Sequence, residues 1–167
     1  MLDSSPLHAE IHRHLDGKPF KRKIAIQSVD LNTGKVIIFD ENTPEDIKAE
    51  AVASSGSIPG AFSPTIINGM TLVDGGVFTN LDLGEAIVRC REEVDKDEDI
   101  IVDIVLCFSE PINLPEWSLE EAKWKNAYQL YERKNDFKDY YFWYYEDVLR
   151  VIRGYPHIKF RYIVTPS

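Results

Sequence analysis

Residues 70–80 read Met70-Thr71-Leu72-Val73-Asp74-Gly75-Gly76-Val77-Phe78-Thr79-Asn80. Two apolar residues lead into a single carboxylate, Asp74, and the glycines Gly75 and Gly76 follow it at once. Because neither glycine has a Cβ, the backbone can turn sharply beside the acid. The arrangement can hold the Asp74 carboxylate at the mouth of a fold, where it could serve as a base. An Asp-Gly pair is also a common hairpin connector, so on this triplet alone a plain turn is the simpler interpretation.

The sequence before this stretch predicts a hairpin followed by a helix. Residues 24–29 and 35–39 are rich in β-forming residues, and the turn sequence of residues 30–34 separates them. Thr43 as a cap, Pro44 at the first helical position and two acids next to it predict a helix start. That helix is expected to end at about residue 54, because a Ser/Gly/Pro-rich segment follows.

The sequence after Asn80 predicts an amphipathic helix and then a buried strand. Apolar residues recur at helical spacing from Leu83 to Val94. Residues 100–108 are nearly all apolar, which is the pattern of an interior strand covered on both faces.

The last third of the sequence predicts two helices and a closing strand. A helix capped near Ser118 is expected to carry an aromatic face, made of Trp117, Trp124, Tyr128 and Tyr131. A further helix is expected over residues 136–153 and a strand over residues 158–164. Strands that alternate with helices of this length predict an α/β layered fold.

Length and charge limit the classes of function. The 167 residues suit one domain with a sizeable core, and 44% hydrophobic with 28% charged residues is globular composition. The net charge of −9 argues against a nucleic-acid partner and against holding an anionic membrane by bulk charge. A local basic cluster at residues 18–23 is better explained as solvent-exposed residues that flank a strand.

Cysteine usage and hydropathy bear on the compartment. Cys90 and Cys107 each lie in an apolar pattern, so we expect two buried free thiols and a reducing environment. No apolar stretch approaches the ~20 residues of a membrane span, and no signal sequence is recognisable at the N-terminus. We therefore expect a cytoplasmic protein, and peripheral association with a membrane stays open.

Two segments imitate metal sites without matching them. His8 and His12 are four residues apart, but the zinc-protease pattern needs a Glu directly after the first His. A solvent-facing helix is expected there. Residues 95–99 imitate the start of a calcium loop, but its sixth and twelfth positions would be Ile100 and Leu106 instead of Gly and Glu. We expect no metal and no cofactor.

Residues 140–145 are six aromatic residues in a row. On a helix they would encircle the axis, so they cannot all face one core. Contact with lipid at a membrane interface is one interpretation. Packing of the helix against the sheet is favoured, because acidic residues surround the run without the basic face typical of a membrane helix.

In this context the Asp74 run resembles the patatin-like phospholipase family. The resemblance covers roughly residues 24–90 and includes the strand pair, the segment at residues 53–60, and residues 74–80. It implies a three-layer α/β/α sandwich. Residues 1–167 would supply the later strands and helices of this sandwich, as the C-terminal part of a patatin-like domain.

The resemblance implies a lipid acyl hydrolase that cleaves fatty-acyl esters of phospholipids or acylglycerols with a Ser–Asp dyad. The Asp-Gly-Gly or Asp-Gly-Ala motif of the family maps onto Asp74, which would be the general base, with Gly75 and Gly76 shaping the turn. Asn80 would anchor this loop by side-chain hydrogen bonds, or alternatively is only a helix-entry residue. Lipid is the expected substrate and partner.

The chain departs from the family pattern at the nucleophile. Members carry a Gly-x-Ser-x-Gly segment upstream of the aspartate and a glycine-rich oxyanion loop. The nearest string, at residues 56–60, has Ser57 in the second position, and Pro59 would spoil a strand-to-helix elbow. We therefore expect the nucleophile to lie outside this chain, both ends to be cut, and residues 1–167 to be inactive alone.

Two other hypotheses stay open. The chain could be a non-catalytic relic of a patatin-like domain that binds lipid or a partner, or an unrelated α/β protein with a plain Asp-Gly turn. The coding sequence upstream of Met1 discriminates between them. An in-frame Gly-x-Ser-x-Gly there would indicate a truncated hydrolase, and a true start codon at Met1 would indicate the relic.

Overall fold

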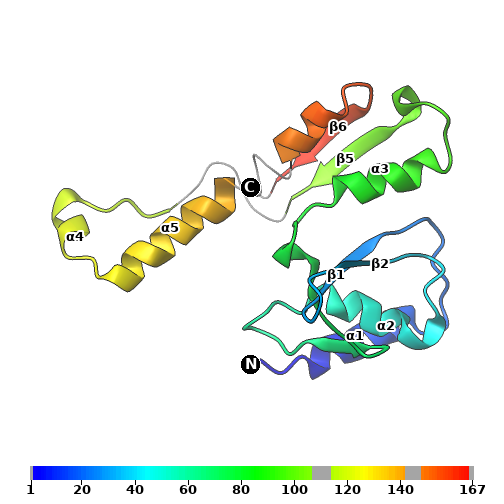
Figure 1. The fold of residues 1–167 in the computed structure, drawn as a ribbon, viewed down its shortest axis with the longest axis horizontal. Coiled ribbons are helices and arrows are strands. Elements are labelled where there is room, and N and C mark those ends of the chain that lie inside the picture. The colour runs from blue at the N-terminus through cyan, green and yellow to red at the C-terminus, as the bar shows by residue number, and fades with distance from the viewer. Residues whose placement is uncertain (1, 107–113, 142–147, 166–167) are drawn as a thin grey trace. The chain divides into compact units, whose positions relative to one another are not determined.

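The computed structural model describes residues 2–106, 114–141 and 148–165 (Figure 1). The chain divides into two compact units, Met1–Glu93 and Val94–Ser167. Each unit combines helices with strands, so the α/β class predicted from the sequence is confirmed. Among the described residues, no helix has the length and apolar character needed to cross a membrane.

The first unit is built on a four-stranded antiparallel sheet with the strand order β2-β1-β4-β3. Its strands are β1 (Ile26–Asp30), β2 (Val36–Phe39), β3 (Thr65–Ile67) and β4 (Met70–Asp74). Its helices are α1 (Ser5–Leu15), α2 (Glu45–Ser54), the 3-10 helix η1 (Gly75–Val77) and α3 (Leu83–Arg91). Helix α2 packs on the sheet and α1 packs on α2 (Figure 1).

The predicted hairpin is confirmed as β1 and β2, and a buried carboxylate organises its turn. Asp30 accepts hydrogen bonds from the Thr33 hydroxyl at 2.7 Å and from the amides of Asn32 and Thr71 at 3.3 and 3.2 Å. These bonds, the Thr33 hydroxyl first, hold the pKa of Asp30 below its usual value despite desolvation. Because Thr71 belongs to β4, the turn is tied to the next strand as well.

A second hairpin joins β3 and β4, and the sequence analysis missed it. Its tip is Asn68-Gly69, and both residues have positive φ, 51° and 78°. Two consecutive residues of that conformation make the type I′ turn that suits the twist of paired strands. The Asn-Gly dipeptide between the apolar residues Ile67 and Met70 was the available signal.

The core of the first unit lies between the sheet and α2. It is formed by the buried residues Phe39, Ala51, Ile67 and Leu72. The predicted helix is confirmed, but its predicted cap is wrong. Pro44 is the N-cap residue, and the Thr43 hydroxyl accepts instead from the Asp40 amide at 3.0 Å. Thr43 therefore closes the turn before the helix rather than the first turn of the helix.

The helix expected after Asn80 is confirmed as α3, with Leu83 and Ile87 buried. The expectation of a buried Cys90 is wrong, since this thiol is exposed. Helix α3 ends at Arg91, so Cys90 lies in its last turn. Cys107 lies outside the described residues.

In the second unit, β5 (Ile101–Val105) pairs in parallel with β6 (Lys159–Val164), which confirms the closing strand. The expectation that residues 100–108 are covered on both faces is wrong where the structure describes them. Ile104 is buried, whereas Ile101 and Val105 are exposed. Side chains alternate along a strand, so one face of β5 is covered and the other is open.

The predicted aromatic helix is in fact two helices, α4 (Leu119–Lys123) and α5 (Ala127–Tyr141). Ser118 caps α4 in a reciprocal box with Glu121, as expected. A second box starts α5, because Asn126 Oδ1 accepts from the Gln129 amide at 2.9 Å and Gln129 Oε1 accepts from the Asn126 amide at 3.1 Å. The four aromatic residues therefore do not share one helix face.

The helix predicted over residues 136–153 is confirmed at every position that the structure describes. Residues 136–141 belong to α5, and the helical residues 148–150 lead into α6 (Val151–Gly154). Most of the aromatic run, residues 142–145, lies outside the described residues. At the other end of the chain, the solvent-facing helix expected around His8 and His12 is confirmed as α1, which has no buried residue.

Candidate functional site

Asp74 is the last residue of β4, and its backbone is fixed on both sides. Antiparallel pairing places it opposite Ser28 of β1. Its amide donates to the Ser57 carbonyl at 3.1 Å, so the loop after α2 also holds the end of β4. The preceding residues Leu72 and Val73 are buried and anchor β4 in the unit.

The Asp74 carboxylate caps the N-terminus of the 3-10 helix η1. Its Oδ1 accepts from the Gly76 amide at 2.6 Å, and the side chain is partly exposed. The amides of Phe78 and Thr79 both donate to the Gly75 carbonyl, at 2.9 and 3.1 Å. The hairpin-connector interpretation of Asp-Gly is therefore wrong, because β4 leads into a tight helical turn and not into a partner strand.

Both glycines of the motif leave space for close neighbours and have no unusual backbone angles, and only at Gly75 is the neighbour rigid backbone. A Cβ on Gly75 would lie 2.7 Å from the Gln27 carbonyl oxygen. A Cβ on Gly76 would lie 2.6 Å from Asn80 Oδ1 and 2.9 Å from Asp74 Oδ1. Gly75 therefore lets the loop close on β1, and Gly76 leaves room for the side chains of Asp74 and Asn80.

The sequence analysis missed Gln27, which holds the loop from β1. Its Nε2 donates to the Gly75 carbonyl at 2.9 Å and to the Thr79 carbonyl at 3.3 Å. Its Oε1 is buried and has no hydrogen-bond partner among the described residues. In sequence, a glutamine between Ile26 and Ser28 looks like an ordinary solvent-facing residue of a strand, so no signal marked it.

Asn80 lies beside the motif, as the anchoring hypothesis requires. Its Oδ1 occupies the space next to Gly76, close to the Asp74 carboxylate. Asp82, and not Asn80, caps α3, since its Oδ1 accepts from the Glu85 amide at 2.9 Å. The structure thus brings all four predicted site residues into one loop.

A family model described as "Patatin-like phospholipase" matches residues 2–87, slightly more than half of the chain. The chain belongs to the patatin-like phospholipase family. The matched span contains the whole four-stranded sheet, the Asp74 loop and the first part of α3. The mixed α/β fold of these residues is that of a partial patatin-like domain, and the family places the chain among lipid hydrolase-type domains.

Apolar side chains flank the Asp-Gly-Gly motif of this patatin-like chain. Val77 and Phe78 follow the motif directly, and Ile58 is adjacent to Ser57, whose carbonyl holds Asp74. All three side chains are more than half exposed, at 55%, 62% and 51%. A carboxylate bordered by exposed apolar groups suits a substrate with both a polar and a hydrocarbon part.

Three serine hydroxyls of β1, α2 and the loop after α2 are buried and structural. Ser28 and Ser54 are fully buried, and their Oγ atoms are hydrogen bonded at 2.7 Å. Ser57 is buried as well, and its hydroxyl donates to the Ala53 carbonyl at 3.0 Å. These bonds satisfy the three hydroxyls inside the first unit.

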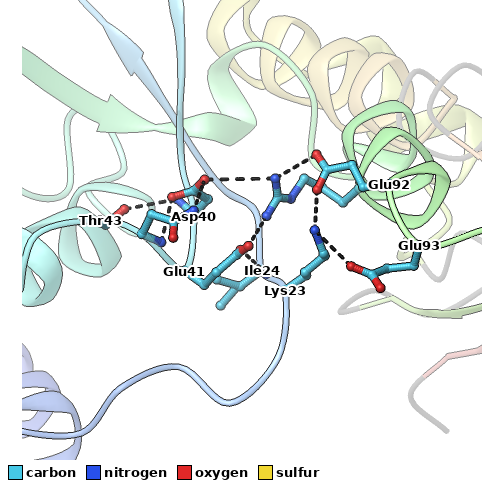
Figure 2. Close-up of polar contacts among 9 residues, drawn as sticks. Lys23, Ile24, Asp40, Glu41, Thr43, Glu92 and Glu93 are labelled. Carbon is cyan, nitrogen blue, oxygen red and sulfur yellow. Dashed lines mark hydrogen bonds and ion pairs between the residues drawn. The ribbon is translucent and has the colours of Figure 1, made fainter.

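A charged cluster made of Lys23, Glu41, Arg89, Glu92 and Glu93 holds α3. Figure 2 shows Lys23 between Glu92 and Glu93. Arg89 of α3 pairs with Glu41, and also with Glu92 at 2.9 Å. The cluster ties α3 to the segments that enter β1 and leave β2.

The electrostatics of this cluster are strongest at Glu41. Its own backbone amide, the Arg89 guanidinium and the Ile24 amide lower the pKa of Glu41 to about 2. Desolvation acts in the opposite direction and is outweighed. Glu41 therefore stays ionised and keeps Arg89 in place across the pH range in which most proteins work.

Proposed function

We propose that residues 1–167 form the C-terminal part of a patatin-like acyl hydrolase domain in which Asp74 is the general base of a Ser–Asp dyad. The observation that supports this most directly is the fixed position of the Asp74 carboxylate. It lies at a strand end, accepts from Gly76, and belongs to a loop that Gln27 clamps to β1. A base needs such fixed geometry more than it needs any particular sequence around it.

In the proposed reaction, a serine hydroxyl attacks the ester carbonyl and its proton passes to the Asp74 carboxylate. Collapse of the tetrahedral intermediate breaks the bond to the alcohol, and the leaving oxygen takes the proton from Asp74. Water then attacks the acyl-enzyme, Asp74 accepts a proton from that water, and the serine recovers it as the fatty acid leaves. The serine and the oxyanion donors would come from sequence outside these 167 residues.

The substrate in this proposal is a phospholipid or an acylglycerol. Ile58, Val77 and Phe78 would contact the hydrocarbon next to the scissile ester, because they are apolar, exposed and adjacent to the motif. Such a substrate resides in membranes or lipid particles, so we propose a cytoplasmic protein that contacts a lipid surface peripherally.

The test is Asp74→Asn in the full-length protein that contains residues 1–167, with hydrolysis of a short-chain acyl ester and of a phospholipid as readouts. Hydrolysis of both should fall to background while the circular dichroism spectrum and melting curve are unchanged. Asp46→Asn is the matched control, since Asp46 is an exposed acid on α2. Retained hydrolysis in Asp74→Asn would rule out Asp74 as the base.

A non-catalytic lipid-binding or partner-binding module is the second candidate, supported by the two buried and mutually bonded serines beside Asp74. It predicts that the full-length protein binds lipid but shows no ester hydrolysis in the wild type. Measurable hydrolysis that depends on Asp74 would exclude it. Hydrolysis by residues 1–167 alone would overturn the placement of the nucleophile outside this chain.

A further inference from the structure

Helix α5 lies outside the span that matches the family, and one of its faces is both apolar and basic. Successive helical residues are about 100° apart, so positions i, i+7 and i+11 fall on one side of a helix. Leu130, Phe137 and Tyr141 have this spacing. We call these three residues the α5 stripe.

The α5 stripe is open to solvent. The exposed fractions are 49% for Leu130, 43% for Phe137 and 53% for Tyr141. No strand or other helix among the described residues shares a broad contact surface with α5. Large apolar side chains aligned on one exposed face are the mark of an interaction surface rather than of a solvated helix.

The charges of α5 are separated around its axis. The cations on or beside the stripe are Arg133, Lys134 and Lys138. The acids Glu132 and Asp136 lie about 200° and 240° around the helix from Leu130, so Glu132 is opposite the stripe and Asp136 is well away from it. Among the described residues of α5, the cations border the stripe and these two acids do not, so the helix carries a basic face.

Aromatic rings hold two of these cations at the border of the stripe. The Arg133 guanidinium lies 4.4 Å from the centre of the Trp117 ring and 5.7 Å from that of Phe137. The Lys134 ammonium lies 5.0 Å from the Tyr131 ring. These cation–π contacts keep positive charge next to apolar surface.

We propose that the α5 stripe docks on a phospholipid surface that contains anionic headgroups. Leu130 and Phe137 reach the boundary of the acyl chains, Tyr141 lies among the headgroups, and Lys134 and Lys138 extend to the phosphates. The charge pattern selects this occupant, because an apolar line bordered by cations matches a hydrocarbon layer covered by phosphate.

The whole chain has a net charge of −9, which opposes an anionic membrane. Attachment would therefore depend on this one face rather than on bulk charge. The inference rests on the proposed function for the identity of the partner, since a lipid hydrolase must reach a substrate that stays in a lipid layer.

The experiment measures co-sedimentation of the full-length protein that contains residues 1–167 with vesicles of phosphatidylcholine alone and with phosphatidylserine added. Wild type should bind the mixed vesicles more tightly. Phe137→Glu should weaken that binding by roughly tenfold or more, because the side chain no longer enters the hydrocarbon boundary. Tyr128→Glu is the matched control: it makes the same charge change at an exposed aromatic residue of α5 outside the stripe, and it should bind close to wild type.

A second pair of variants tests the basic border. Lys138→Gln should weaken binding to the anionic vesicles by about fivefold and leave binding to neutral vesicles unchanged. Lys35→Gln, an exposed lysine next to β2, removes the same charge and should have no such effect. Circular dichroism of each variant confirms that helix content is retained.

The outcomes separate this inference from the proposed function. Absence of wild-type binding, or equal binding by Phe137→Glu and Tyr128→Glu, would overturn the docking surface whatever Asp74 does. Analytical ultracentrifugation could instead show a wild-type dimer that Phe137→Glu converts to a monomer, with no vesicle binding. That result would assign the stripe to contact with a second copy of the chain and would also overturn the lipid-docking surface. Vesicle binding should be the same in Asp74→Asn as in wild type, so loss of hydrolysis in that variant leaves this inference standing.

Discussion

Gln27 and Gly75 hold each other in place from adjacent segments of the first unit. The Gln27 side chain donates to the Gly75 carbonyl at 2.9 Å, and the Gly75 backbone comes so close to β1 that a Cβ would lie 2.7 Å from the Gln27 carbonyl oxygen. Gln27 thus supplies both the side-chain hydrogen bond to the loop and the backbone carbonyl that the loop approaches closely. The position of the Asp74 carboxylate depends on this pair, because η1 begins at Gly75.

Gly75→Ala should destabilise the first unit by about 1–3 kcal/mol, because the new methyl group meets backbone that cannot rotate away. Urea denaturation followed by circular dichroism measures the change. Gly84→Ala in α3 is the control, since a Cβ there would meet Asp82 at an ordinary 3.5 Å, and alanine favours a helix. Equal stability of the two variants would contradict the close approach at Gly75.

Gln27→Met should release the loop that follows Asp74. It removes the donor to the Gly75 and Thr79 carbonyls while keeping a similar side-chain volume, and we expect a cost of about 1–3 kcal/mol. Amide hydrogen exchange of Phe78 and Thr79, whose N–H groups bond to the Gly75 carbonyl, should become faster. Gln27→Glu should not restore protection, because a carboxylate cannot donate to these carbonyls. Unchanged exchange in Gln27→Met would rule out the clamp.

Acid should weaken the attachment of α3 within a defined pH range. The folded-state pKa of Glu41 is about 2, below its ordinary value of 4.5, so its contribution is fully present above pH 4.5 and is lost as the pH falls toward 2. The difference in unfolding free energy between wild type and Glu41→Gln should therefore be constant near neutral pH. It should shrink as the pH falls from about 4.5 to 2.

Glu93→Gln provides the comparison for Glu41→Gln, since Glu93 is exposed and pairs with Lys23 at 3.1 Å. An exposed ion pair of this kind contributes little to the free energy of unfolding. The difference in that free energy between wild type and Glu93→Gln should therefore be small at every pH. A difference for Glu41→Gln that persists unchanged to pH 2 would show that Arg89 is not its partner in solution.

Gly69→Ala should destabilise the β3–β4 hairpin by about 1–2 kcal/mol, because an alanine pays a steric cost at a φ of 78°. Gly69→Asn should recover part of that loss, since asparagine tolerates the left-handed region. Thermal denaturation of the three proteins gives the order. A hairpin that tolerates alanine as well as glycine would contradict the type I′ turn.

The parts of the fold that the sequence predicts are those encoded by local patterns. Runs of β-forming residues predict the β1–β2 hairpin and β6, and helical spacing predicts α3. The cap at Ser118 can be recognised directly in the sequence. The family follows from the Asp74 run together with the segments before it. The break between α4 and α5 was not predicted, because the spacing of the aromatic residues suggested one continuous helix. The signal for a new helix start was Asn126 with Gln129 three residues later, which form a second capping box.

The supports of the candidate site could not be predicted from local patterns. Gln27 acts on a loop about fifty residues away in sequence, and such a contact exists only after β1 and β4 have paired. The reason for both glycines is likewise spatial, since their φ angles are not among the positive values. Helical spacing places Cys90 on the same face as the buried Leu83 and Ile87, and it does not encode the exposure of this thiol.

Strand β4 separates two ends that should respond differently to insertion and deletion. At the Asn68-Gly69 end, the side chains are exposed and a Cβ on Gly69 would meet nothing within 4 Å. At the Asp74 end, the Asp74 amide bonds to the Ser57 carbonyl, the Gly75 carbonyl accepts from Gln27, and a Cβ on Gly76 would meet Asn80. Because β1 holds β4 independently of β3, extra residues or a fluorescent label at the hairpin tip should leave the carboxylate in register, whereas one added residue after Asp74 should displace it. The tip is therefore the place at which natural length variation and engineered probes would be tolerated.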